Sequence, residues 1–466
     1  MTLKKYIGDK KFYKMVLTVA LPIMVQNGIS NFVNLLDNVM VGRLGTEAMS
    51  GVTIVNQFIF IFNLLIFGAL SSAGIFTAQF HGNGDVDGER YTVRFKLILA
   101  LLSGIAGVVV FLSFDNSLIS LFLHEGSAEG DLAKTLAYGK EYLSVMVVGL
   151  IPFAFAQVYA STLRETGKTV LPMIAGMISV GVNLVLNYVF IFGHFGAPAL
   201  GIKGAALATV ISRFAELVIL VVWTHRHRDK CSFIVGVYRS MRIPRKLIGQ
   251  IVVRGLPLML NELLWSISVT LTNQCYSLRG IEVVAALNIS TTISNVFGII
   301  YISLGSAIAI VVGNLLGAGK LEEAKDTDKK MIAFSIMCSV TVGILLICCS
   351  GLFPHAYNTT ETAKNIATYM IIVYAITMPA HAYVNAAYFT LRSGGKVVTT
   401  MLFDSGYMWT VVVPTAFCVS RFTGLNIYWL YAICQSLDII KSAFGAILLK
   451  KGNWVNQLVA DDKLKK

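Results

Sequence analysis

Twelve long stretches with few charged residues recur along the chain, and each can cross a bilayer as a helix of about 20 residues. They lie near residues 16–38, 51–78, 97–114, 142–163, 170–192, 204–224, 255–277, 284–311, 331–353, 365–391, 397–418 and 426–449. Only 14% of the 466 residues are charged, whereas soluble proteins have roughly 25%. The sequence therefore predicts an all-α polytopic membrane protein. The composition excludes a disordered chain, a secreted disulfide scaffold and a globular nucleic-acid-binding domain.

The Lys and Arg residues are distributed unevenly among the segments that join these spans. If the N-terminus is inside the cell, 29 of the 38 lie in segments on that side and seven on the other. Cytoplasmic loops carry such an excess, so we expect a multi-pass protein of the plasma (inner) membrane with both termini cytoplasmic. The richest segment, from Arg226 to Arg254, suits either a topology anchor or a contact with anionic lipid headgroups.

The second half of the chain repeats the first at an offset of 235 residues. Leu21-Pro22 matches Leu256-Pro257, and Gly82-Asn83-Gly84 matches Gly317-Ala318-Gly319. Each half has six spans, an even number, so both halves enter the membrane from the same side, as in parallel-repeat transporters. We predict an N-terminal lobe at 1–225, a basic cytoplasmic linker at 226–254 and a C-terminal lobe at 255–466.

The first span has a polar face that hydrocarbon would not tolerate without a reason. On a helix, six polar side chains and the carboxylate of Asp37 share an arc of about 140°. The six are Gln26, Asn27, Ser30, Asn31, Asn34 and Asn38. Amide contacts between helices explain one or two such residues, but not a continuous stripe with an acid. We therefore predict a water-accessible pathway with Asp37 as its titratable group.

Three residues of the fifth and sixth spans can join Asp37. Asn183 and Asn187 are four apart and share one helix face, and Thr209 can lie beside them. Carboxylate and amide oxygens suit a proton or Na⁺, but one negative charge among neutral ligands holds Na⁺ weakly. We predict a cation-coupling site that favours H⁺, with Na⁺ as the alternative and no other metal or cofactor. Simple hydrogen bonding between helices would produce the same pattern.

The second half has its own charged residues within spans. Glu262 occupies the repeat position of Asn27, so Asn261 and Glu262 are predicted to line a substrate cavity together with Gln26, Asn27, Ser30 and Asn34. Arg213 with Glu216, and Asp438 with Lys441, are three residues apart and are predicted to form structural charge pairs. Asp404 has no partner that the sequence identifies, and His381 is expected to be packed and hydrogen-bonded.

Several sequence motifs resemble those of the multidrug and toxic compound extrusion (MATE) family. They are Leu21-Pro22, Asn34-Leu35-Leu36-Asp37, Gly42-Arg43-Leu44-Gly45, Asn183 with Asn187, Gly204-Ala205-Ala206 and, in the second half, Gly255-Leu256-Pro257 and Gly313-Asn314. The resemblance covers essentially the full chain. It implies a V-shaped pair of six-helix lobes that exports amphipathic, often cationic, compounds in exchange for Na⁺ or H⁺.

The resemblance also implies roles for single residues. The family's first-helix carboxylate corresponds to Asp37, its fifth-helix asparagine to Asn183 and its sixth-helix threonine to Thr209. Many relatives carry a second acid where this chain has Asn187, which favours protons over Na⁺ here. One branch uses carboxylates on helices 7 and 10. Glu262 lies about one turn before that branch's position, and helix 10 has no acid, so this assignment fails.

Other functions were weighed against export. A lipid-linked oligosaccharide flippase of the same superfamily is the nearest alternative, although its cavity would be more cationic. A major-facilitator transporter would carry a basic Gly-Asp-Arg-type loop where this chain has Gly82-Asn83-Gly84-Asp85. A membrane-embedded transferase is less favoured, because no catalytic motif is present. We expect a monomeric transporter, not an enzyme, whose partners are small molecules and membrane lipids and not nucleic acid.

Overall fold

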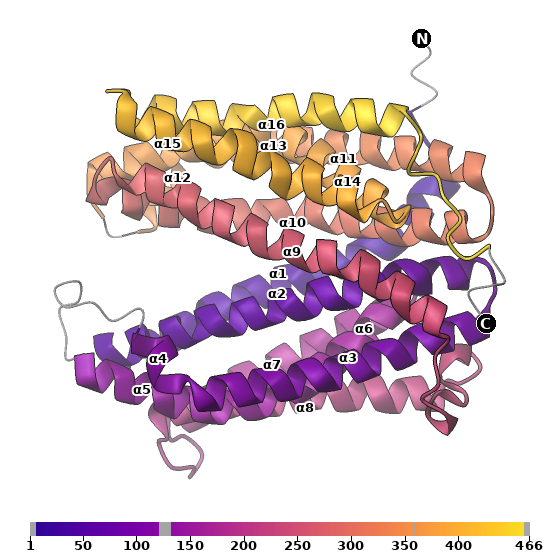
Figure 1. Cartoon of the computed structure of the whole chain (residues 1–466). Coiled ribbons are helices and arrows are strands. Elements are labelled where there is room, and N and C mark those ends of the chain that lie inside the picture. The colour runs from indigo at the N-terminus through magenta and orange to yellow at the C-terminus, as the bar shows by residue number, and fades with distance from the viewer. Residues whose placement is uncertain (1–5, 121–131, 358, 461–466) are drawn as a thin grey trace. The chain divides into compact units, whose positions relative to one another are not determined.

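A computed structural model describes residues 6–120, 132–357 and 359–460, without the side chains of residues 34, 35, 38 and 39. The described part of the chain contains helices and no β-strand. The first half consists of α1 (Lys10–Gly42), α2 (Thr46–Gly82), α3 (Val86–Ser113), α4 (Asp115–Ser120), α5 (Leu132–Met146), α6 (Leu150–Glu165), α7 (Val170–Phe192) and α8 (Gly201–Arg226) (Figure 1).

The second half begins after two short 3₁₀ turns, η3 (Ser232–Ile234) and η4 (Val237–Arg239). Its helices are α9 (Arg245–Ser277), α10 (Ile281–Gly317), α11 (Leu321–Cys349), α12 (Leu352–His355), α13 (Glu361–Ser393), α14 (Val397–Met401), α15 (Val413–Phe422) and α16 (Ile427–Lys450). Two π-helical segments, Leu402–Gly406 and Met408–Val412, join α14 to α15.

Twelve helices among the described residues are long and apolar enough to cross a membrane, and they coincide with the twelve predicted spans. The all-α polytopic fold class is confirmed. The helices are longer than the apolar stretches, since α3 begins at Val86 and α11 at Leu321, each about ten residues before the predicted span. Hydropathy marks only the apolar part of a helix, whereas the backbone hydrogen bonds continue beyond it into polar sequence.

The internal repeat is visible in the helices themselves. α1 and α9 both have 33 residues, α2 and α10 both have 37, and each pair is offset by 235 residues at both ends. The glycines that end matching turns also agree, because Gly84 and Gly319 both have a left-handed φ, +71° and +73°. The two halves therefore contain the same succession of helices and turns.

The described residues form two compact units, which do not follow the chain continuously. The first unit contains residues 25–77 and 85–249, and in it α3, α6, α7 and α8 pack side by side (Figure 1). The second unit contains residues up to 24, residues 78–84 and residues from 250 onward, with α10, α11, α13 and α16 at its centre. The lobe boundaries at 1–225, 226–254 and 255–466 remain a prediction.

The end of α2 lies directly against the end of α10 inside the second unit. A Cβ atom on Gly82 would lie 1.9 Å from the carbonyl oxygen of Asn314, and one on Gly317 would lie 2.0 Å from that of Gln79. Gln79 and Asn314, like Gly82 and Gly317, are 235 residues apart, so the contact is reciprocal between repeat positions. Only glycine allows two helix backbones to approach so closely.

The chain after α16 covers this crossing. The side chain of Gln457 donates to the carbonyl oxygen of Gly317 at 2.8 Å, and the side chain of Gln79 accepts from the backbone of Leu458 at 2.7 Å. Gln79 also donates to the carbonyl oxygens of Ser393 and Asn456, at 3.1 and 3.2 Å. The C-terminal tail, defined as residues 452–459, thus supplies hydrogen-bond partners where the helix ends leave polar groups.

Alanine at either crossing glycine is expected to destabilise the protein. Gly82→Ala or Gly317→Ala forces the two backbones apart, and overpacking of this kind costs about 1–3 kcal/mol. The melting temperature in detergent, followed by intrinsic fluorescence, should fall for both variants. Gly181→Ala is the control, because its Cβ meets nothing within 4 Å and helical alanine is favoured over glycine. Equal melting temperatures for all three variants would contradict the tight crossing.

Candidate functional site

The four residues predicted to couple a cation form one continuous hydrogen-bonded chain in the first unit. The side-chain nitrogen of Asn187 donates to Oδ1 of Asp37 at 2.6 Å and to Oδ1 of Asn183 at 3.2 Å. Asn183 in turn donates to the hydroxyl of Thr209 at 3.2 Å. The hydroxyl of Thr209 donates to the backbone carbonyl of Ala205 at 3.1 Å. We call these four side chains the Asp37 chain.

Helix packing positions the Asp37 chain. Asn183 and Asn187 are one turn apart on α7, and both are buried. Gly204 brings α8 against α7, since a Cβ there would lie 2.5 Å from the carbonyl oxygen of Phe190. This close approach allows Thr209, just over one turn beyond Gly204, to reach Asn183.

The chemistry of the Asp37 chain is that of one acid facing neutral groups. A carboxylate accepts hydrogen bonds, amides both donate and accept, and a hydroxyl does either. Among the described residues no group of three or more His, Cys, Asp or Glu side chains gathers as a metal site. The donor set therefore suits a proton or a weakly held monovalent cation better than a multivalent metal.

The other predicted residues of the first span are placed separately. Gln26 packs against Gly176 of α7 and lies 3.5 Å from a guanidinium nitrogen of Arg164. Asn27 and Ser30 are half-buried on α1. The side chain of Asn34 lies outside the described residues. Their predicted role in a substrate cavity stays a prediction.

In the second unit, Asn261 and Glu262 contact different groups. Asn261 is buried and donates to Oδ2 of Asp404 at 3.1 Å, while its own oxygen accepts from Ser405 at 2.7 Å. Glu262 accepts from the hydroxyl of Tyr388 at 2.8 Å. Asn261 therefore fastens α9 to the π-helical segment that contains Asp404. Such segments are frequent at functional sites, and the cavity role of both residues stays a prediction.

The predicted charge pair between Asp438 and Lys441 is wrong. Lys441 binds Oδ1 of Asp404 at 2.8 Å, and Asp438 binds Nδ1 of His381 at 2.6 Å. Asp404 thus has the partner that the sequence did not reveal, and His381 has the packed, hydrogen-bonded position predicted for it. Helical spacing brings two charges to one face but does not decide between a neighbour on the same helix and one on the next helix.

The predicted pair of Arg213 and Glu216 is also wrong. Arg213 donates to the carbonyl oxygen of Gly149 at 3.2 Å, and its guanidinium lies 4.9 Å from the ring centre of Phe153. A carbonyl and an aromatic face therefore receive this cation within the first unit. Sequence spacing contains no information on either contact.

Sequence reasoning missed two buried charges at the helix ends. Lys96 of α3 has a fully buried side chain that forms an ion pair with Glu165 of α6 and a 3.3 Å hydrogen bond to Thr162. At the repeat position of Thr162, Thr390 donates to the buried carboxylate of Asp328 at 2.5 Å. Matching threonines thus contact a cation in one half and an anion in the other. The longer helices would have revealed both, because the predicted spans excluded Lys96 and Asp328.

Comparison with known proteins adds the family. The family model described as MatE matches residues 22–189 and 257–417, which is most of the chain. The chain belongs to the MATE family. Its members are transporters and not enzymes, and the MATE assignment agrees with the twelve apolar helices of a multi-pass membrane protein.

Two bacterial MATE relatives are similar over nearly their whole length. The "Probable multidrug resistance protein NorM" of Thermotoga maritima is 25% identical over 455 residues, which cover 96% of this chain and 94% of the relative. The "Multidrug resistance protein PmpM" of Pseudomonas aeruginosa is 25% identical over 418 residues, which cover 87% and 83%.

Solved MATE structures share the fold. A structure described as an outward-facing conformation of a multidrug resistance MATE family transporter matches with a TM-score of 0.85 and 20% identity, over 96% of this chain and 98% of that one. A transporter from Pyrococcus furiosus matches with a TM-score of 0.84 and 20% identity, over 96% and 97%.

Removing one partner of the Lys96–Glu165 pair is expected to destabilise the protein by about 3–5 kcal/mol, because the other charge remains buried alone. Lys96→Met should therefore lower the melting temperature sharply. The double variant Lys96→Met, Glu165→Met should regain much of the loss, since no unpaired charge remains. Lys325→Met removes a cation from an exposed pair with Glu322 and should change stability by less than about 1 kcal/mol. A double variant no more stable than Lys96→Met would contradict the buried pair.

Proposed function

We propose that this protein exports amphipathic, cationic small molecules across the plasma membrane in exchange for protons, with Asp37 as the coupling carboxylate. The observation that supports the proposal is the Asp37 chain, which links an acid on α1 to neutral side chains on α7 and α8. Ionisable residues within membrane spans are expensive and mark ion pathways. The names of the relatives support drugs as substrates.

The neutral partners favour a proton over Na⁺. Hard cations bind best where several oxygen ligands supply charge. The Asp37 chain offers one carboxylate, two amides and one hydroxyl, and the amide of Asn187 presents its nitrogen to Asp37. A proton needs only the carboxylate itself.

Protonation would reverse the donors along the Asp37 chain. In the structure, Asn187 donates to Asp37 and to Asn183, and Thr209 donates to the backbone of α8. A protonated Asp37 is a donor, so Asn187 must turn its oxygen towards it. Asn183 then donates to that oxygen, and Thr209 donates to Asn183 instead of the backbone. One proton thus changes the contacts between α1, α7 and α8, which is how binding can bias two conformations of the transporter.

The substrate would contact polar groups of both halves. Gln26, Asn27, Ser30 and Asn34 belong to α1, and Asn261 and Glu262 belong to α9, at matching places in the repeat. An acid such as Glu262 attracts organic cations, and nearby aromatic rings add cation–π contacts. We propose these six residues as the lining of the path, with both termini cytoplasmic and the monomer as the working unit.

Asp37→Asn is expected to abolish export, because an amide binds no coupling proton. In a drug-sensitive bacterial host, cells that produce wild-type protein should retain less ethidium than cells with Asp37→Asn at equal expression. The matched control is Asp326→Asn, which alters an exposed carboxylate paired with Lys330 and should export as the wild type does. Wild-type efflux by Asp37→Asn would contradict the assigned role. Unchanged retention of a broad panel of cationic compounds by the wild type would refute export itself.

A second carboxylate beside Asp37 is expected to introduce a response to Na⁺. In proteoliposomes, drug movement by the wild type should follow an imposed pH gradient and ignore a Na⁺ gradient. Asn187→Asp adds charge to the oxygen ligands, so this variant should respond to Na⁺. Wild-type transport driven by Na⁺ alone would refute proton coupling, and Asn187→Leu serves as the control that removes the amide without adding charge.

A further inference from the structure

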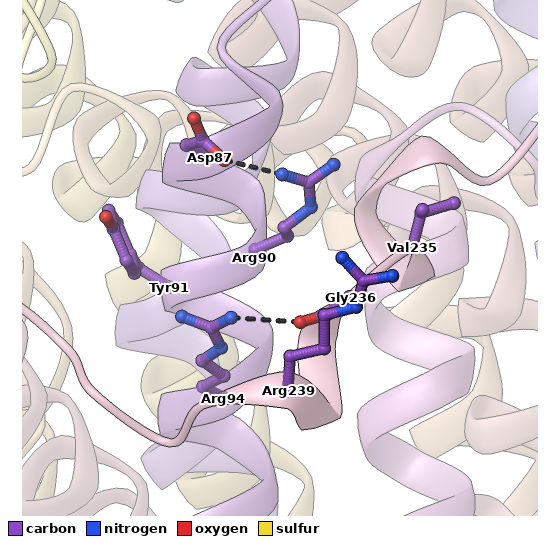
Figure 2. A pocket seen from close by; sticks show the side chains of 7 residues that line it. All are labelled: Asp87, Arg90, Tyr91, Arg94, Val235, Gly236 and Arg239. Carbon is purple, nitrogen blue, oxygen red and sulfur yellow. Dashed lines mark hydrogen bonds and ion pairs between the residues drawn. The ribbon is translucent and has the colours of Figure 1, made fainter.

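A basic pocket lies in the first unit, away from the Asp37 chain, between the start of α3 and the linker that follows α8. It has a volume of about 340 Å³. Figure 2 shows the side chains that line it, which are Asp87, Arg90, Tyr91, Arg94, Val235, Gly236 and Arg239. Three guanidinium groups face one carboxylate, so the lining has an excess of two positive charges.

The three arginines retain capacity to bind an anion. Arg90 pairs with Asp87 at 2.5 Å, but its buried Nε has no hydrogen-bond partner. Arg94 is buried and donates to the carbonyl oxygens of Val237, Gly236 and Arg242, at 2.9, 3.1 and 3.1 Å. Neutral carbonyls satisfy its donors but do not cancel its charge.

The third arginine completes the pocket from the linker. Arg239 is exposed, and no ion pair involves it in the described part of the chain. Gly236 has a left-handed φ of +76° and turns the linker so that Arg239 lies beside it, facing α3 (Figure 2). Convergent guanidinium groups are the usual protein recognition element for phosphate.

The position of the pocket decides what kind of phosphate can reach it. Arg90 and Arg94 lie in the first turns of a membrane-spanning helix, and the linker starts directly after α8 ends at Arg226. The linker also exposes three large apolar side chains next to the pocket, Val235 at 44%, Tyr238 at 51% and Met241 at 49%. Exposed apolar groups beside cationic ones are typical of segments that rest in the membrane interface.

We propose that this pocket binds the phosphate of an anionic phospholipid headgroup, with the exposed apolar side chains of the linker in contact with the lipid's acyl region. Arg239 and Nε of Arg90 supply the hydrogen bonds, Arg94 supplies charge, and Tyr91 forms the wall on α3. A bound lipid would join the linker to the start of α3. This site is separate from the substrate path and does not depend on the identity of the exported compound.

Native mass spectrometry of the full-length protein in detergent tests the proposal, with dioleoylphosphatidylglycerol and dioleoylphosphatidylcholine as competing probes. The wild type should retain phosphatidylglycerol in preference. Arg239→Gln and Arg90→Gln should each weaken its binding by about fivefold or more, since one basic residue at an anionic membrane surface contributes about that factor. Lys230→Gln is the matched control, because it removes one exposed charge from the same linker outside the pocket. It should change binding by less than about twofold.

Further arms distinguish the source of the phosphate. Soluble glycerol 3-phosphate should compete poorly, and Val235→Ser should weaken binding of the lipid while leaving binding of glycerol 3-phosphate unchanged. Equal loss in all three charge variants would show diffuse attraction and overturn the pocket. No loss in any variant would do the same. Glycerol 3-phosphate that binds as tightly as the lipid would overturn the assignment to a membrane lipid.

Discussion

The contact between the ends of α2 and α10 is the constraint on which the second unit depends. Two glycines at repeat positions allow each backbone to touch the carbonyl of the other helix, at distances that exclude any side chain. A short segment of the first half, residues 78–84, is thereby incorporated in the unit formed by the second half. Duplication of an ancestral half preserves such a contact naturally, because each copy supplies one glycine and one partner.

Buried polarity is treated differently in the structural and the candidate functional parts. Lys96, Asp404 and Asp438 each have an oppositely charged or ionisable partner within hydrogen-bonding distance. Asp37 is instead bonded to the neutral amide of Asn187. A paired charge stabilises one arrangement, whereas an acid held by amides can exchange a proton without losing a salt bridge. This contrast separates the Asp37 chain from the ion pairs.

The sequence was sufficient for the number of spans, the repeat and the four residues of the Asp37 chain, because hydropathy and helical spacing are local properties. It failed for the partners of Lys441 and Arg213, since contacts between helices depend on rotation and crossing, which spacing along one helix does not contain. Lys96 and Asp328 were missed for another reason. They lie where the helix continues beyond the apolar stretch, so hydropathy placed them in loops.

The C-terminal tail has a consequence for the order of assembly. Its residues bind Gly317, Gly394 and Gln79, so the last part of the chain to be synthesised holds a contact whose first strand of sequence ends at residue 84. Until residue 458 has left the ribosome, the close approach of α2 and α10 has no cover, and its carbonyls lack these partners. The second unit therefore becomes complete only when synthesis is nearly finished, and a nascent chain that stops at the end of α16 is an unfinished protein.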